Sequence, residues 1–282
     1  MKTIIVPTDF SKNAYGALYY VTQLFARDTC KFILMNSFEN QVTNLTSRID
    51  IGKTEAVVNE LYDTTEVRCE ELKHKIIRDT NNKSHTYHTI ATSLSLTRAI
   101  NQLVKKEDAD YVVMGGKGSK GADNILMGSN TLLMIRKIQN APLLVIPSPL
   151  NFKPIKKIAF ATGFKRPYSK KELEPLVTIS SLYEANIKIV HVNKKEKMSD
   201  IQRVNVHELF KLLGSAHPEN TWLYDNDNSY DAIGSYVQKE HIDILAMISY
   251  KHNAIVRLFR EATLKKIAKH ATIPFLILPK ID

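Results

Sequence analysis

The sequence predicts an α/β protein of two tandem doubly wound domains, each with a parallel sheet covered by helices on both faces. Three observations support this prediction: short apolar runs rich in Val, Ile and Leu, amphipathic segments of helical period between them, and a pattern that occurs twice in 282 residues. Apolar strands separated by helices are typical of a parallel sheet buried on both faces. Right-handed crossovers then place helices on both sides, which is a Rossmann-like arrangement.

Both halves of the chain begin with the same elements. KTIIVPTDFSKNAYGAL (residues 2–18) and KKIAFATGFKRPYSKKEL (156–173) each give an apolar strand, a Thr-x-Phe turn and a helix, and Ser11 is the expected N-cap of the first helix. A second strand follows in each half, KFILMNSF (31–38) and IKIVHVNK (187–194). A repeat of this length is too long for a solenoid and indicates a duplicated domain.

The later elements also match between the halves. DADYVVMG (108–115) is similar to HIDILAMI (241–248), and each half closes with a helix and an apolar strand that ends in proline, at 135–147 and 264–279. The linker SPLNFKP (148–154) separates the expected domains, which are residues 1–148 and 154–282.

Two segments of the first half have helical period. The first (58–77) is expected to place its apolar residues on one face, and so is the second (95–110). The expected face residues are Leu61, Val67, Leu72 and Ile76 in the first segment and Leu96, Ile100 and Val104 in the second.

Composition excludes several classes of protein. No apolar run approaches the roughly 18 residues of a membrane span, and the N-terminus MKTIIVPTDF is too short in apolar residues for a signal peptide. The net charge is +10, but most lysines alternate with acids, which favours a solvated surface over a nucleic-acid face. Cys30 and Cys69 have no metal-ligand spacing, so we expect reduced thiols and a cytoplasmic protein without a membrane partner.

Glycines gather in one stretch, GGKGSKGADNILMGSNT (115–131), of a chain that has ten in all. The stretch follows a late strand, where ligands of open parallel sheets bind. Gly115 and Gly118 can adopt positive φ and, without a Cβ, would let a phosphate approach the backbone. Gly128 opens a helix whose N–H groups, dipole and hydroxyls suit a di- or triphosphate. A glycine-assisted helix start on a surface loop is the alternative.

The stretch matches neither common phosphate motif. It lacks the GK[ST] ending of a P-loop. Its one G-x-G-x-x-G match, at residues 116–121, does not adjoin the helix start, so a dinucleotide fingerprint is disfavoured.

The spacing Gly115-x2-Gly118-x9-Gly128-Ser129 resembles the signature of ATP-binding members of the universal stress protein family. The opening IIVPTDFS resembles the family's first strand and turn, ILMNSF stands where the family reads Leu-His-Val, and APLLVIP resembles its last strand, which pairs edge to edge in family dimers. The resemblance covers nearly the whole chain as a tandem pair. It implies ATP, or AMP or ADP, bound with Mg²⁺ or Mn²⁺, and a role in the stress response.

Carried over position by position, the resemblance implies where the nucleotide lies. Pro7, Thr8 and Asp9 would flank the nucleoside, and Ser37 would face the adenine edge. Asp9 has a second reading as a turn-forming residue after a strand. The residues implied for the ribose are Met114 and Gly115, and those implied for the phosphates are Lys117, Gly118, Gly128, Ser129, Asn130 and Thr131.

The second half departs from this pattern. Side chains stand at the expected backbone approaches, and one of them is acidic where phosphate would lie. We therefore expect no nucleotide there and a role in pairing with the first domain, as in the family's dimers. The corresponding pairs are Pro7 and Ala161, Asp9 and Gly163, Gly115 and Ile248, Gly118 and Lys251, Gly128 and Arg260, Ser129 and Glu261, and Thr131 and Thr263.

No catalytic set is evident. The nine histidines fit no zinc spacing, there is no Gly-x-Ser-x-Gly elbow, and no base is placed for an attacking water, so slow ATP hydrolysis is the most activity we expect. His191, at the end of an apolar strand, is expected to be structural. Three hypotheses stay open: an ATP-dependent binding module that contacts a partner protein or forms a homodimer, a nucleotide-free scaffold, and an ATP-using enzyme of related architecture. The last is disfavoured because PTDFS replaces the Ser-Gly-Gly-x-Asp-Ser loop of such enzymes.

Overall fold

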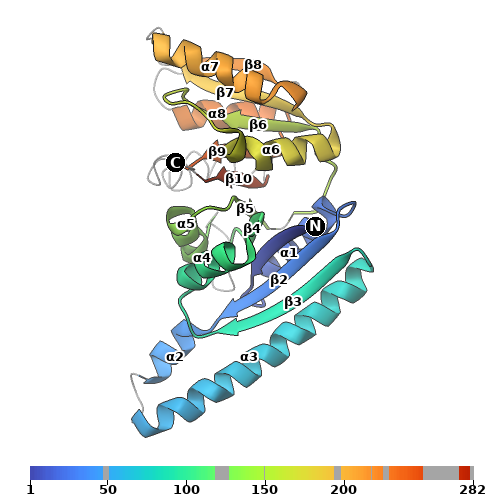
Figure 1. The fold of residues 1–282 in the computed structure, drawn as a ribbon, viewed down its shortest axis with the longest axis vertical. Coiled ribbons are helices and arrows are strands. Elements are labelled where there is room, and N and C mark those ends of the chain that lie inside the picture. Colours follow the sequence, from blue (N-terminus) through green and yellow to red (C-terminus); the bar gives the residue numbers. More distant parts are fainter. Residues whose placement is uncertain are drawn as a thin grey trace.

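The computed structural model describes residues 1–46, 51–117, 127–148, 150–193, 198–216, 218–224, 229–249 and 273–279. Its core is one ten-stranded sheet with the order β3-β2-β1-β4-β5-β10-β9-β6-β7-β8 (Figure 1). The predicted fold class is confirmed, because each half is a parallel five-stranded α/β unit.

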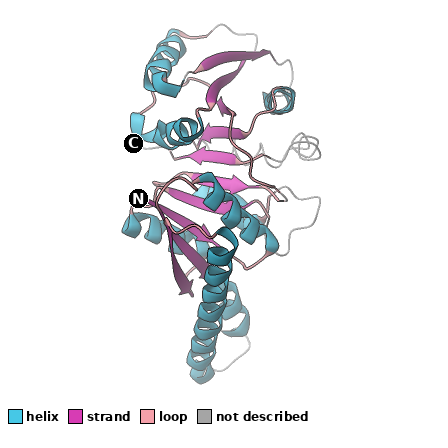
Figure 2. Cartoon of the chain, turned by 90° about the vertical axis from the view of Figure 1, so that its right-hand side faces the viewer, coloured by secondary structure: helices cyan, strands magenta, loops and turns pink. Residues whose placement is uncertain are grey.

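The N-terminal domain contributes the first five strands. These are β1 (Lys2–Pro7), β2 (Cys30–Ser37), β3 (His85–Thr92), β4 (Tyr111–Gly115) and β5 (Leu143–Ile146). Its helices are α1 (Lys12–Leu24), α2 (Glu39–Thr46), α3 (Ile51–Thr80), α4 (Leu96–Glu107) and α5 (Ser129–Lys137). Helix α2 and the first part of α3 extend beyond the sheet (Figures 1 and 2).

The C-terminal domain contributes the other five strands. These are β6 (Lys157–Ala161), β7 (Asn186–Asn193), β8 (Glu219–Tyr224), β9 (Ile244–Ile248) and β10 (Phe275–Leu278). Its described helices are α6 (Lys170–Tyr183), α7 (Asp200–Leu212), the 3₁₀ turn η1 (Gly214–Ala216) and α8 (Ser229–Lys239).

The two domains meet at the edge strands β5 and β10. These strands are antiparallel, with Phe275 opposite Val145, whereas every other pair of neighbours in the sheet is parallel. An antiparallel contact between two parallel sheets relates the domains by a pseudo-twofold axis. The strands of the two domains therefore run in opposite directions, and the carboxyl ends of the strands lie on opposite sides of the sheet in the two domains.

Helices cover both faces of the sheet (Figure 2). One face packs against α1, α3, α6 and α7, and the other packs against α4, α5 and α8. Alternate residues of β1 serve the two cores, because Ile4 and Val6 face the first and Ile5 faces the second. Among the described residues, no helix has the length and apolar character needed to cross a bilayer.

Within the described residues the predicted local structure is found with two exceptions, while the helix expected from residue 264 and the positions 251, 260, 261 and 263 lie outside the described residues. Ser11 is the N-cap of α1, where its Oγ accepts a hydrogen bond from Ala14 N at 3.2 Å. Helix α3 is 30 residues long, so it is longer than segment 58–77. The prediction that Val67 faces the core is wrong, because this side chain is 59% exposed. At 100° per residue Val67 is rotated far from Leu72, and Cys69 takes the buried position instead.

Candidate functional site

The turn between β1 and α1 lies where the carboxyl ends of the parallel strands of the N-terminal domain meet. Thr8 is buried, and its Oγ1 accepts a hydrogen bond from Phe10 N at 2.9 Å. Asp9 is exposed, and its Oδ1 accepts from Ser11 N at 3.0 Å, which is the turn-forming role considered above. Phe10 has a φ of 60°, which is an uncommon value for a bulky residue, and the hydrogen bonds of Thr8 and Asp9 lie on either side of it in the turn.

Strand β2 ends beside this turn. The backbone N–H of Thr8 donates to Met35 O at 2.8 Å, and Asn36 Nδ2 donates to Thr8 O at 2.7 Å. Ser37 is half-buried, and its Oγ donates to Leu94 O at 2.6 Å. Asn36 was not among the predicted site residues, although a polar residue at the end of an apolar strand was a visible signal.

Gly115 is the last residue of β4, and its role differs from the expectation. No described glycine has a positive φ, so Gly115 does not use the left-handed conformation that glycine allows. A Cβ at this position would lie 3.0 Å from Asn13 O and 3.2 Å from Asn13 C. Glycine is needed here because the first turn of α1 passes directly over the strand end. Gly118 lies outside the described residues.

Helix α5 begins against the same strand end. Gly128 is its N-cap with φ −70° and ψ 160°, and no side chain caps the first turn. Gly128 N donates to Gly116 O at 2.7 Å, and the buried Thr131 Oγ1 donates to Gly115 O at 2.9 Å. These two bonds fix the start of α5 to β4. Ser129 and Asn130 are exposed at the helix start.

The remaining predicted residues differ in what they offer to a ligand. Pro7 is buried, and Met114 is only 6% exposed with its side chain in the core shared with α4 and α5, so Met114 can offer only its backbone to a ribose. Lys117 is half-buried directly after Gly116. The structure thus brings the ends of β1, β2 and β4 and the start of α5 to one edge of the sheet.

This edge suits an anionic group. Gly128 makes no side-chain cap to the first turn of α5, and no side chain among the described residues does so, so backbone N–H groups and the positive end of the helix dipole lie there. Gly128 has no Cβ, so no side chain stands over the backbone at the N-cap of α5, whereas Gly115 lies directly against the backbone of Asn13. A polyphosphate therefore fits the donor set, with hydroxyls at Ser129 and a cation at Lys117 nearby.

The corresponding edge of the C-terminal domain has different chemistry. Strand register places Ile248 at the position of Gly115, since both stand four residues after the strand residue that pairs with Ile158 or Ile4. Ser11 follows Phe10 directly, whereas residues 165–168 separate Phe164 from the N-cap Ser169. The second domain therefore has four more residues between this turn and its helix.

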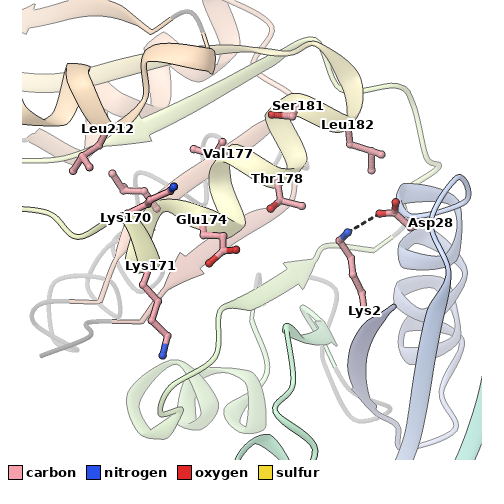
Figure 3. A pocket seen from close by; sticks show the side chains of 11 residues that line it. Lys2, Asp28, Lys170, Lys171, Glu174, Val177, Thr178, Ser181, Leu182 and Leu212 are labelled. Carbon is pink, nitrogen blue, oxygen red and sulfur yellow. Dashed lines mark ion pairs between the residues drawn. The ribbon is translucent and has the colours of Figure 1, made fainter.

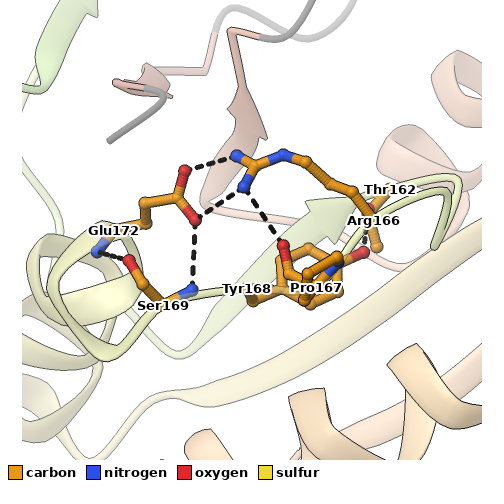
Figure 4. Close-up of polar contacts among 6 residues, drawn as sticks. All are labelled: Thr162, Arg166, Pro167, Tyr168, Ser169 and Glu172. Atoms are coloured by element: carbon orange, nitrogen blue, oxygen red, sulfur yellow. Dashed lines mark hydrogen bonds and ion pairs between the residues drawn. The ribbon is translucent and has the colours of Figure 1, made fainter. Parts of the chain in front are cut away.

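Side chains occupy this longer connection. Arg166 Nη1 donates to Glu172 Oε2 at 3.2 Å, and its Nη2 makes a second, shorter bond to Glu172 Oε1 (Figure 4). Glu172 is fully buried and also accepts from Ser169 N at 3.1 Å in a capping box. From α7, Gln202 Nε2 donates to Gly163 O at 2.9 Å. The turn that would face a nucleoside is thus held by protein groups.

His191 has a structural role in this domain. It stands at the register position of Asn36. Its Nδ1 lies 2.8 Å from Thr162 O, and Asn36 Nδ2 lies 2.7 Å from Thr8 O, the corresponding carbonyl. Its ring packs 4.9 Å from that of Phe164 and 5.4 Å from that of Trp222. One hydrogen bond therefore fixes the turn carbonyl in both domains.

Metal-ligating side chains and cysteines were the other candidate functional groups in the sequence. No three His, Cys, Asp or Glu side chains there gather as a metal site. Burial raises the pKa of the Cys30 thiol to about 12 and that of Cys69 to about 11, so neither is a thiolate near neutral pH.

The fold and this edge define a tandem α/β protein with a helix N-terminus open to anions at the strand ends of its first domain. The profile of the universal stress protein family matches residues 1–147. The chain belongs to this family, which confirms the resemblance.

Relatives extend the match to the whole chain. The universal stress protein Slr1230 of Synechocystis is 26% identical over 292 residues, which cover 98% of this chain and 99% of that protein. The universal stress protein MJ0577 of Methanocaldococcus jannaschii is 26% identical over 156 residues, or 51% of this chain and 94% of that protein. The solved structure of a universal stress protein from Archaeoglobus fulgidus has a TM-score of 0.64 at 15% identity and covers 99% of this chain and 97% of that chain, which shows the shared fold.

Proposed function

We propose that the N-terminal domain binds ATP with Mg²⁺ or Mn²⁺ and that the chain is a cytoplasmic regulatory module of the stress response. In this proposal the nucleoside lies against residues 7–9 and the end of β2. The ribose lies over the backbone of Met114 and Gly115, and the phosphates lie against Lys117, Gly118 and residues 128–131. AMP and ADP share the nucleoside contacts, and they would differ from ATP in how many phosphates reach α5.

One observation supports the proposal most directly. Helix α5 starts at a glycine without a side-chain cap, at the carboxyl end of β4, where a second glycine lies against the first turn of α1. Uncapped N–H groups and a helix dipole at the edge of a parallel sheet form a general anion site. Membership of the family makes ATP the candidate anion.

The C-terminal domain is proposed to bind no nucleotide. Ile248 replaces glycine at the strand end, and Gln202 satisfies the turn carbonyl of Gly163. Its proposed role is to complete the structure of the first domain. The antiparallel contact of β5 with β10 supports this role, as do the bonds from Tyr111 to Pro175 O at 3.0 Å and from Tyr183 to Leu24 O at 2.6 Å.

The test uses the variant Gly128→Asp in the full chain. Aspartate is at least as good an N-cap as glycine, and Gly128 has extended backbone angles, so the fold is expected to retain its stability. The carboxylate would occupy the first-turn N–H groups and repel phosphate, so binding should be lost. Gly163→Ala is the matched control, because its added Cβ lies 3.7 Å from the nearest atom, a side-chain carbon of Lys165.

Two measurements decide the outcome. Mass spectrometry of denatured protein should detect adenine nucleotide in the wild type and in Gly163→Ala but not in Gly128→Asp. MgATP at about 100 times its Kd should stabilise the wild type by about 2.7 kcal/mol. A chain that carries no nucleotide and shows no thermal shift in millimolar MgATP would instead be a nucleotide-independent scaffold.

A further inference from the structure

A groove runs along α6 where the two domains meet, away from the proposed nucleotide site. Its volume is about 760 Å³. The outward side of α6 forms one wall, and Lys2 and Asp28 of the N-terminal domain form part of the other (Figure 3). Val177 and Leu182 give the wall an apolar part.

Charge is distributed unevenly along the groove. Lys2 and Asp28 form an ion pair with a distance of 3.0 Å at one end, so their charges offset each other. Lys170 and Lys171 are exposed at the other end, and neither has an ion-pair partner within the described part of the chain. Glu174 is the nearby acid on the same helix. The α6 end therefore has a net positive charge.

The internal repeat shows what fits such a groove. Thr178 is the ninth residue after the N-cap Ser169, and Tyr20 is the ninth after the N-cap Ser11. Tyr20 thus stands on α1 where Thr178 stands on α6. The counterpart of Asp28, in the turn before the second strand, is Tyr183.

A segment of the chain itself fills the counterpart groove. The Phe152 ring, from the linker between the domains, lies 5.3 Å from the Tyr20 ring and 5.9 Å from the Tyr183 ring. Leu150 packs against the same core. The linker is a single segment, so it occupies only one of two grooves that the pseudo-twofold axis relates. None of the described residues occupies the groove along α6 in the same way.

We propose that the groove along α6 binds an extended peptide segment of a partner protein, with an aromatic side chain between Thr178 and Asp28 and carboxylates beside Lys170 and Lys171. The aromatic side chain follows from the place of Phe152 in the related groove. The carboxylates follow from two exposed lysines that have no ion-pair partner among the described residues. This site is independent of the proposed nucleotide site, since it lies at the amino end of β1.

The test measures fluorescence polarisation with the full chain and a fluorescein-labelled peptide, Asp-Asp-Leu-Asn-Phe-Gly. Two control peptides carry Ala in place of Phe, or Lys in place of both Asp residues. We expect the first peptide to bind with a Kd below about 1 mM and each control to bind about tenfold more weakly. No binding of the first peptide at 1 mM, or equal binding of all three, would overturn the proposal.

Variants locate the binding site. Ser181 is exposed in the groove wall, so Ser181→Trp should fill the groove and abolish binding while the melting temperature stays constant. The double variant Lys170→Glu, Lys171→Glu should weaken binding at least tenfold at low salt, whereas the exposed Lys165→Glu should not. Binding that survives Ser181→Trp counts against this site. Light scattering that shows a dimer in the wild type and a monomer in Ser181→Trp would assign the groove to a second copy of the chain and refute the peptide proposal.

Discussion

Gly115 and Gly16 make a matched pair that tests the packing of α1 on β4. A Cβ on Gly115 would lie 3.0 Å from Asn13 O, and both this oxygen and Asn13 C belong to the backbone. The first turn of α1 would have to move for alanine to fit. Overpacking of this kind costs about 1–3 kcal/mol. Gly16 lies within α1 and has no atom within 4 Å of the added Cβ, so alanine should stabilise the fold by up to about 1 kcal/mol.

The expected difference between Gly115→Ala and Gly16→Ala is therefore about 1–4 kcal/mol in the free energy of unfolding. Urea unfolding followed by circular dichroism measures it, and a parallel thermal melt should show a shift of roughly 2–4 °C for each kcal/mol. The first variant should also lose MgATP affinity under the proposed function, because the turn before α1 moves with its first turn. Equal stability of the two variants would show that Asn13 does not press on the strand end.

Two further predictions concern buried polar groups. Burial lowers the pKa of His85, so below about pH 6.5 the unfolded chain binds a proton that the folded chain does not, and the free energy of unfolding decreases as the pH is lowered, by at most about 1.4 kcal/mol per pH unit. The urea midpoint at pH 5.5 should therefore lie below that at pH 7.5. His85→Gln should reduce this difference, whereas the exposed His88→Gln should not. Glu172→Gln should lower the free energy of unfolding by about 2–3 kcal/mol, which is less than the loss for a fully buried ion pair because Arg166 is partly exposed. Glu208→Gln, on an exposed ion pair, should leave the urea midpoint unchanged. Equal effects of these two substitutions would refute the assigned role of Glu172.

Periodicity predicted most of the fold but not all of its strands. The apolar runs of β1, β2, β4 and β5 are buried on both faces, so their sequences differ clearly from helices. Strand β3 (HTYHTIAT) was not predicted, because it forms one edge of the sheet and has exposed or half-buried residues at most positions. Strand β8, at the other edge, was missed for the same reason.

The candidate site was predictable in position but less so in detail. The Thr-x-Phe turn and the late strand lie together at one edge, as their order in a parallel sheet requires. The contact between Gly115 and Asn13 was not predictable, because it depends on where α1 crosses the strand. Met114 stays a predicted ribose contact, and the structure adds that its side chain is buried in the core with α4 and α5. The sequence did not indicate this, because the alternation of side chains along a strand does not say which helices cover each face.

The comparison of the two copies explains why the glycine at the strand end and the length of the first turn change together. In the N-terminal domain the helix follows Phe10 at once, and its first turn leaves no room for a side chain at position 115. In the C-terminal domain the register puts Ile248 at this position, and residues 165–168 delay the helix. A side chain at the strand end with the short turn would overpack, and the long turn with glycine would leave a gap. Asn36 and His191 donate to the corresponding turn carbonyls, Thr8 O and Thr162 O, in the two domains. The two domains therefore differ in the residue at the strand end and in the length of the turn, but they share the hydrogen bond that holds the turn.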